Sequence, residues 1–130
     1  MKDPIADMMN MLKNAGNAGK PTITIPHSKH KLAIAQCLKD QGYLASIEEV
    51  KNKNGIMSLT LGVAYSAGLP KIKHVDRVSK TSRRVYSGVG TITNVRQGQG
   101  IVVLSTPKGI LSGKDAKTAQ VGGEVLFNIW

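Results

Sequence analysis

The chain has 130 residues, of which 41% are hydrophobic, enough for one compact domain or two small ones sharing an interface. It is too short for a typical two-domain enzyme. Eighteen Lys and Arg residues oppose eight Asp and Glu residues, giving a formal net charge of +10. Such an excess on a small protein favours a polyanionic partner, so nucleic acid is the leading partner class.

The single cysteine, Cys37, excludes an intramolecular disulfide and a cysteine-based zinc cluster, and it fits a reducing compartment such as the cytoplasm. His27, His30 and His74 are too scattered to predict a metal site. No apolar run reaches the roughly 20 residues needed to cross a bilayer, and acidic residues stand where a signal peptide would carry positive charge. We therefore expect a cytoplasmic protein without a cofactor.

The first half of the chain predicts two helices and three strands. Asp3-Pro4 is typical of an N-cap followed by proline at the first helical position, and Ser28 is the expected N-cap of the second helix. Asn54-Gly55 favours a hairpin turn in which both residues have positive φ. The expected elements, in chain order, are a helix ending near residue 16, a strand at 22–25, a helix from 28 to 42, and strands at 43–50 and 56–63.

The stretch from Ser66 to Pro70 is the best candidate boundary, because small residues and a Gly/Pro pair interrupt the pattern. Residues 1–64 hold eight basic and five acidic residues, a net charge of +3. Residues 65–130 hold ten basic and three acidic residues, a net charge of +7, so the second half carries most of the charge. It is also rich in strands, expected at 72–78, 84–86, 101–104 and 124–130, with a loose glycine-punctuated connection over 88–100.

These elements predict an α+β fold. An N-terminal helix and strand half, residues 1–65 in the order α-β-α-β-β, is expected to pack against a C-terminal half, residues 66–130. The C-terminal half is expected to be a mostly antiparallel β structure with one short helix.

The most informative stretch is Ser105-Thr106-Pro107-Lys108-Gly109, where a buried-strand pattern gives way to hydroxyls, a lysine and a glycine. Such a loop can offer Ser and Thr hydroxyls to phosphates or base edges, a cation to the backbone, and a close approach at the glycine. The alternative is an ordinary β-turn with solvated polar residues. The S-x-x-K spacing of Ser105 and Lys108 also occurs in penicillin-recognising enzymes, but their other motifs and scaffold are missing here.

A second basic stretch places Lys80, Arg83 and Arg84 directly before Tyr86. Arginine offers a planar fork for phosphate, and tyrosine can stack on an unpaired base, a combination that suits irregular RNA. The alternative is a solvated basic loop with Tyr86 half in the core.

Two further segments are weaker candidates. Lys29 and Lys31 stand at the start of the second helix, where backbone N–H groups attract phosphate, although the sequence favours the alternative of a solvated helix end. Gly122 and Gly123 let another backbone come close, but a β-bulge is the simpler interpretation. Glu124, if it lies beside RNA, has to accept from a base amino group or hold a neighbouring arginine.

With these stretches in view, the chain resembles the S-eight family of bacterial small-subunit ribosomal proteins nearly end to end. The Ser105-Thr106-x-Lys108-Gly109 segment and the later Gly-Gly-Glu strand, in that order and spacing, are specific to it. Pro107 departs from the family, which often has a third hydroxyl there, and removes one N–H from the segment. In all, the resemblance rests on residues 3–8, 34–43, 83–86, 101–109 and 121–126, which include these two segments, and on the terminal Trp130.

The resemblance implies a protein that binds the central domain of small-subunit ribosomal RNA early in assembly, among neighbouring ribosomal proteins. In some bacteria it also represses a ribosomal-protein messenger RNA. By position, the resemblance places Ser105, Thr106 and Lys108 against the RNA, with Tyr86 and Glu124 flanking them and the region of Lys29 and Lys31 meeting RNA from the other half.

The hypothesis is therefore a non-enzymatic structural RNA-binding protein. A sequence-tolerant DNA-binding or chromatin-like protein would use the same net charge and is the alternative. An enzyme has no residues to support it, since no P-loop, dinucleotide fingerprint or nucleophile-base signature appears in the sequence.

Overall fold

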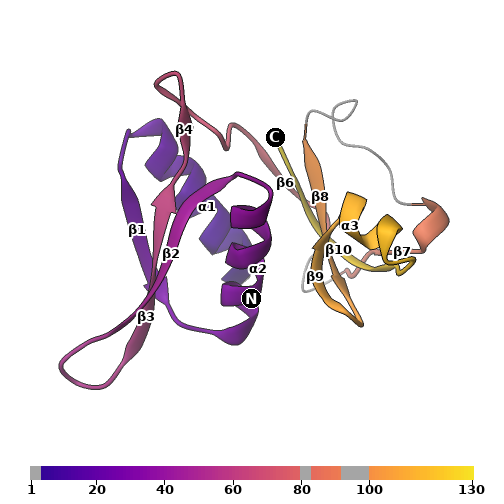
Figure 1. Cartoon of the computed structure of the whole chain (residues 1–130), viewed down its shortest axis with the longest axis horizontal. Helices are drawn as coiled ribbons and strands as arrows, with labels where there is room; N and C mark the ends of the chain where they lie inside the picture. Colours follow the sequence, from indigo (N-terminus) through magenta and orange to yellow (C-terminus); the bar gives the residue numbers. More distant parts are fainter. Residues whose placement is uncertain (1–3, 80–82, 92–99) are drawn as a thin grey trace. The chain divides into compact units, whose positions relative to one another are not determined.

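The computed structural model describes residues 4–79, 83–91 and 100–130, which form two compact units, Pro4–Lys73 and His74–Trp130 (Figure 1). Both contain helices and antiparallel sheets, which confirms the predicted α+β class. By these units the charge divides evenly. Residues 4–73 hold nine basic and four acidic residues and residues 74–130 hold eight basic and three acidic residues, a net charge of +5 in each.

The first unit is a three-stranded antiparallel sheet in the order β1-β3-β2, with both helices on the same side of the sheet (Figure 1). Its elements are α1 (Pro4–Asn17), β1 (Thr22–Pro26), α2 (Lys29–Asp40), β2 (Leu44–Lys51), β3 (Met57–Val63), β4 (Tyr65–Ser66) and β5 (Leu69–Pro70). The predicted order of helix, strand, helix, strand, strand is confirmed.

Alternation along the strands directs one face of this sheet into the core. Ile23 of β1 lies opposite Leu61 of β3, and Ile25 lies opposite Leu59, and all four side chains are buried. The apolar stripe of α1, which includes Met8, is also buried. The residues that the sequence pattern places on one face of the strands and on one stripe of the helix are therefore the residues buried from water.

Ser28 caps α2 as predicted, because its Oγ accepts a hydrogen bond from the Lys31 backbone N–H at 3.0 Å. The predicted N-cap Asp3 lies outside the described residues.

The turn between β2 and β3 differs from the expected one. Gly55 has a φ of +80°, but Asn54 is not among the residues with positive φ, so the prediction of two such residues was wrong. The Asn52 side chain organises the turn instead, since its Oδ1 accepts from the Asn54 N–H at 2.9 Å and from the Ile56 N–H at 3.0 Å. An Asx-type turn removes the need for a second left-handed residue.

The second unit is built around β10, which pairs with three other strands. Its sheet has the order β6-β10-β8-β9, and β7 pairs with β10 beside this path. Its elements are β6 (Val75–Arg77), β7 (Tyr86–Ser87), the 3₁₀ helix η1 (Val89–Thr91), β8 (Ile101–Thr106), β9 (Gly109–Ser112), α3 (Gly113–Thr118) and β10 (Gly123–Ile129).

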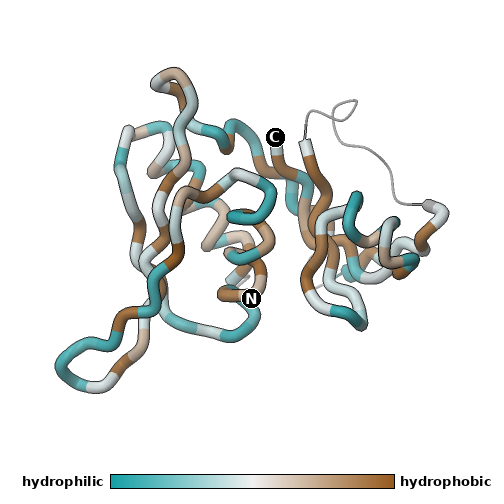
Figure 2. Tube along the Cα trace, in the orientation of Figure 1, coloured by the Kyte–Doolittle hydropathy of each residue, from teal (hydrophilic) through white to brown (hydrophobic). Residues whose placement is uncertain are grey.

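The short helix α3 supplies part of the core of this unit. Ala116 is fully buried and clusters with Val102 and Leu104 of β8. Ser112 caps α3, its Oγ accepting from the Asp115 N–H at 3.2 Å. Figure 2 shows hydrophobic segments along the strands and hydrophilic ones in α3 and at the chain turns.

Three predictions for this unit need adjustment. The strand expected at 72–78 is confined to Val75–Arg77, and the one expected at 84–86 is Tyr86–Ser87. The connection expected over 88–100 contains η1, and its residues 92–99 lie outside the described part of the chain. No helix in the described residues is long and apolar enough to cross a membrane.

Candidate nucleic-acid interface

The 105–109 segment is a tight hairpin turn between β8 and β9, with Thr106 opposite Gly109. The Thr106 hydroxyl donates to the Gly109 carbonyl oxygen at 2.7 Å and accepts from the Lys108 N–H at 3.2 Å. Gly109 has a φ of +117°, a conformation that requires glycine. The turn therefore uses the Thr106 hydroxyl internally, while within the described part of the chain no hydrogen bond engages the Ser105 hydroxyl.

Strand pairing brings three of the predicted residues into one row across the sheet. Glu124 of β10 lies opposite Ser105 of β8 on one side and opposite Tyr86 of β7 on the other. Directly opposed residues on antiparallel strands direct their side chains to the same face, about 5 Å apart. Ser105, Glu124 and Tyr86 thus form a continuous polar row, which we call the 105–124–86 row.

Tyr86 is the most exposed large side chain of this row, at 71% of its maximum. The sequence left open whether its ring would be half in the core, and the structure places it in solvent. A flat ring that already faces solvent can receive a nucleobase without rearrangement of the core.

Glu124 is mostly buried and pairs with Arg84, whose Nη1 lies 3.0 Å from Glu124 Oε2. Of the two partners that the sequence offered for Glu124, a base amino group or a neighbouring arginine, the structure shows the arginine. Arg84 itself is half-exposed, so the guanidinium group that Glu124 holds remains partly in contact with solvent.

Ser79 is a residue of this region that the sequence did not single out. It is fully buried, and its Oγ accepts from the Val85 N–H at 2.8 Å and donates to the Val85 carbonyl at 3.1 Å. These bonds join Ser79 to Val85, which lies between Arg84 and Tyr86 in the sequence, and so hold both of these residues beside β10. A single serine in a polar run carries no signal for this role.

The structure explains the glycine pair before Glu124 differently from the expected bulge. A Cβ on Gly123 would overlap the Ser105 carbonyl, and one on Gly122 would overlap the Ser87 carbonyl. The irregularity in β10 lies farther along, between Val125 and Phe127. The interpretation as a bulge at the glycines was therefore wrong, and close backbone approach is what these positions require.

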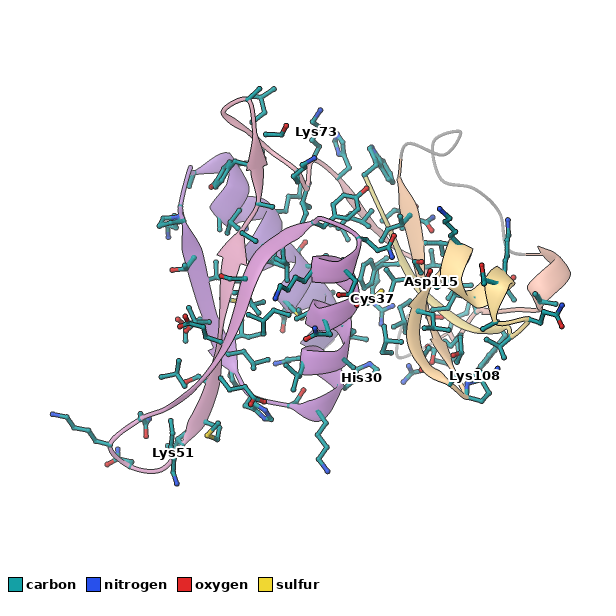
Figure 3. All side chains as sticks on the ribbon, in the orientation of Figure 1. His30, Cys37, Lys51, Lys73, Lys108 and Asp115 are labelled. Carbon is teal, nitrogen blue, oxygen red and sulfur yellow. The ribbon has the colours of Figure 1, made fainter. Side chains whose placement is uncertain are left out.

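The Lys108 side chain reaches α3, its Nζ lying 3.4 Å from the Ala119 carbonyl at the C-terminal cap (Figure 3). This long, exposed bond is weak, so the ammonium group remains available to a phosphate. Pro107 and Lys108 are both exposed at the tip of the turn.

The remaining predicted residues are distributed as follows. Arg83 is exposed next to Arg84, and Lys80 lies outside the described residues. Lys29 and Lys31 stand in the first turn of α2, in the other unit. Among the described residues no group of three His, Cys, Asp or Glu side chains is placed to hold a metal ion.

These features define a small basic α+β protein in which strand pairing aligns a serine, a glutamate and an exposed tyrosine across one sheet. The family model described as "Ribosomal protein S8" matches residues 3–130. The chain is 44% identical over 126 residues to "Small ribosomal subunit protein uS8" of Acidovorax ebreus, covering 97% of this chain and 95% of that protein. It is 42% identical over 130 residues to the protein of the same name from Ruegeria pomeroyi, covering the whole of both chains.

The chain belongs to the ribosomal protein S8 family. This membership confirms the predicted family and, with it, a structural and non-enzymatic role in the ribosome.

Proposed function

We propose that this protein binds the central domain of small-subunit ribosomal RNA through the second unit and is required there for subunit assembly. The observation that carries the proposal is the 105–124–86 row, because three separate strands bring an unengaged hydroxyl, a carboxylate that holds Arg84, and an exposed ring side by side. A row of this kind suits irregular RNA, whose unpaired bases stack on aromatic rings and whose sugars and phosphates accept hydrogen bonds.

Each group has a distinct task in this proposal. Tyr86 stacks on an unpaired base or sugar, Ser105 donates to a phosphate or base edge, and Lys108 neutralises a nearby phosphate. Thr106 and Gly109 hold the turn in shape, so their contribution to binding comes chiefly through the position of their neighbours. Arg83 and Arg84 extend the positive surface, with Glu124 orienting Arg84. Lys80, which the same basic stretch of the sequence contains, is proposed to bind phosphate as well.

Lys29 and Lys31 bind RNA phosphates from the first unit. Both follow the capped start of α2, where no acidic side chain occupies the first turn. The positive end of the helix dipole therefore adds to the charge of the two lysines.

The test compares Tyr86→Ala with Tyr86→Phe on two RNAs, a central-domain stem with an internal loop and a fully paired duplex. Loss of one stacked base costs about 1–3 kcal/mol, so the alanine variant should lose about tenfold or more in affinity for the looped stem. The phenylalanine variant should keep most of it. Equal losses on the looped stem and the duplex would favour the DNA-binding or chromatin-like alternative.

The same surface is proposed to bind a ribosomal-protein messenger RNA that carries a similar element, which would make the protein a translational repressor. Because one row can hold one RNA at a time, the two RNAs should compete. A messenger fragment that binds without displacing the ribosomal stem would exclude this second role.

A further inference from the structure

The end of the β2–β3 hairpin extends beyond the packed part of the first unit (Figure 1). Strand β1 pairs with β3 only as far as Ser58, and every residue from Val50 to Met57 is exposed. No core requirement of this unit therefore explains which residues occupy the hairpin end, which we define as residues 50–57.

The hairpin end has a defined shape. Besides the two bonds to Asn52 Oδ1, the Asn52 N–H donates to the Ile56 carbonyl and the Gly55 N–H donates to the Asn52 carbonyl, both at 3.0 Å. Four hydrogen bonds within five residues restrict the backbone before any partner arrives. A preorganised turn loses less conformational entropy when it binds than a flexible loop does.

Three large apolar side chains stand on this end, Ile56 at 61% exposure, Val50 at 41% and Met57 at 36%. Val50 lies opposite Ser58, two residues beyond Ile56, so Val50 and Ile56 are diagonal neighbours on the same face. Val50 and Ile56 therefore form a small exposed apolar surface on one face of a rigid turn, against which the apolar atoms of a partner can pack.

The charge at the hairpin end is positive. Lys51 and Lys53 are exposed, Lys51 pointing away from the unit in Figure 3, and the sequence contains no acidic residue between Glu49 and Asp76. Glu49 is engaged with His27, whose Nε2 lies 3.0 Å from its carboxylate.

The start of α2 lies at the same end of the unit. The His27 N–H donates to the Met57 carbonyl at 3.3 Å, and Met57 is directly opposite Lys51. Only Ser28 separates His27 from Lys29 in the sequence, so the lysines of the helix start and those of the hairpin end belong to one basic end of the unit.

We propose that the hairpin end is a further RNA-binding surface, in which Lys51 and Lys53 bind phosphates and Ile56 packs against the adjoining sugars. The inference rests on the proposed function in one respect, that the partner is ribosomal RNA. Charge complementarity favours RNA over a protein partner, because the first unit alone carries a net charge of +5 and needs a polyanion near its lysines. The acidic pair Glu48 and Glu49 marks where this surface ends.

The test uses the full-length protein and full-length small-subunit ribosomal RNA. Lys51→Gln with Lys53→Gln removes two phosphate contacts, so the salt-dependence slope of binding should fall by about 1.5 and the affinity by about tenfold near 0.15 M salt. Ile56→Ser should weaken binding about threefold without changing the slope. The matched control is Lys20→Gln with Lys39→Gln, which removes the same charge from the same unit away from the hairpin and should have little effect.

A direct measurement places an iron chelate on Asn54→Cys in a Cys37→Ala background and maps the cleavage of the ribosomal RNA. Cleavage near the tether supports the surface. Equal losses in the two double variants, an unchanged slope after Lys51 and Lys53 are replaced, or a chelate that cleaves no RNA would each overturn it.

Tyr86→Ala separates this result from the proposed function. If the hairpin variants bind normally while Tyr86→Ala binds weakly, the hairpin surface is wrong and the proposed function stands. If the unmodified protein does not bind the RNA, both are wrong.

Discussion

Replacement of Gly123 by alanine is the sharpest test of how the candidate interface is built. Its added methyl group would overlap the carbonyl oxygen and carbon of Ser105 and lie 3.0 Å from Thr106 Cα. All three atoms are backbone, so no flexible side chain can move aside. Strands β10 and β8 must separate locally, and overpacking of this kind costs about 1–3 kcal/mol.

The matched control is Gly90→Ala, because a methyl group added at Gly90 would meet no atom within 4 Å and the φ of Gly90 is not positive. Urea unfolding followed by the fluorescence of Trp130, the one tryptophan in the chain, reports on the second unit. The midpoint of Gly123→Ala should fall by about 1 M relative to the control.

Affinity for the looped RNA stem should fall in the same variant, because Ser105 and Thr106 shift with the strand. A Gly123→Ala protein as stable as Gly90→Ala, with unchanged RNA affinity, would refute the close backbone approach and its role in the row.

Three other changes have definite expected outcomes. Ser79→Ala removes a buried hydroxyl that bonds both the N–H and the carbonyl of Val85, and the Val85 carbonyl keeps only its bond from the Val125 N–H. Urea unfolding should show a loss of about 1–3 kcal/mol, and an unchanged midpoint would contradict this role. Asn52→Ala removes two hydrogen bonds of the exposed hairpin turn and should lower the free energy of unfolding by about 1 kcal/mol or less. Hydrogen exchange should become faster only at the Asn54 and Ile56 amides, and an equal change at all amides would contradict the role of Asn52 in the turn. Burial raises the pKa of the Tyr43 hydroxyl above its ordinary value of 10.0. The folded state therefore favours the neutral hydroxyl, and the stability that this preference contributes is fully present below pH 10 and is lost as the pH rises through the raised pKa. Tyr43→Phe should therefore lose less stability than the parent between pH 9 and 11 in parallel urea titrations. Identical losses in the two proteins would show that ionisation of Tyr43 does not cause the loss.

The sequence by itself predicted the two helices and the three longer strands of the first unit, though not β4 and β5, and it indicated the class of partner. Ser28 marks the start of α2, and the alternation in β1 selects its buried face, because capping and periodicity act over a few residues. The same local reasoning failed at Asn54, where the side chain of Asn52 supplied an alternative way to close the turn. A net charge of +10 indicated a polyanion without locating its contacts.

Only the tertiary structure decided how the candidate interface is assembled. Ser105, Glu124 and Tyr86 are separated along the chain and become neighbours because β10 pairs with both β8 and β7. The same pairing explains Gly123, whose constraint comes from a backbone that lies far away in the sequence. Propensity and spacing describe a segment with its near neighbours, whereas strand pairing depends on the free energy of the whole sheet, and so its register becomes visible only after folding.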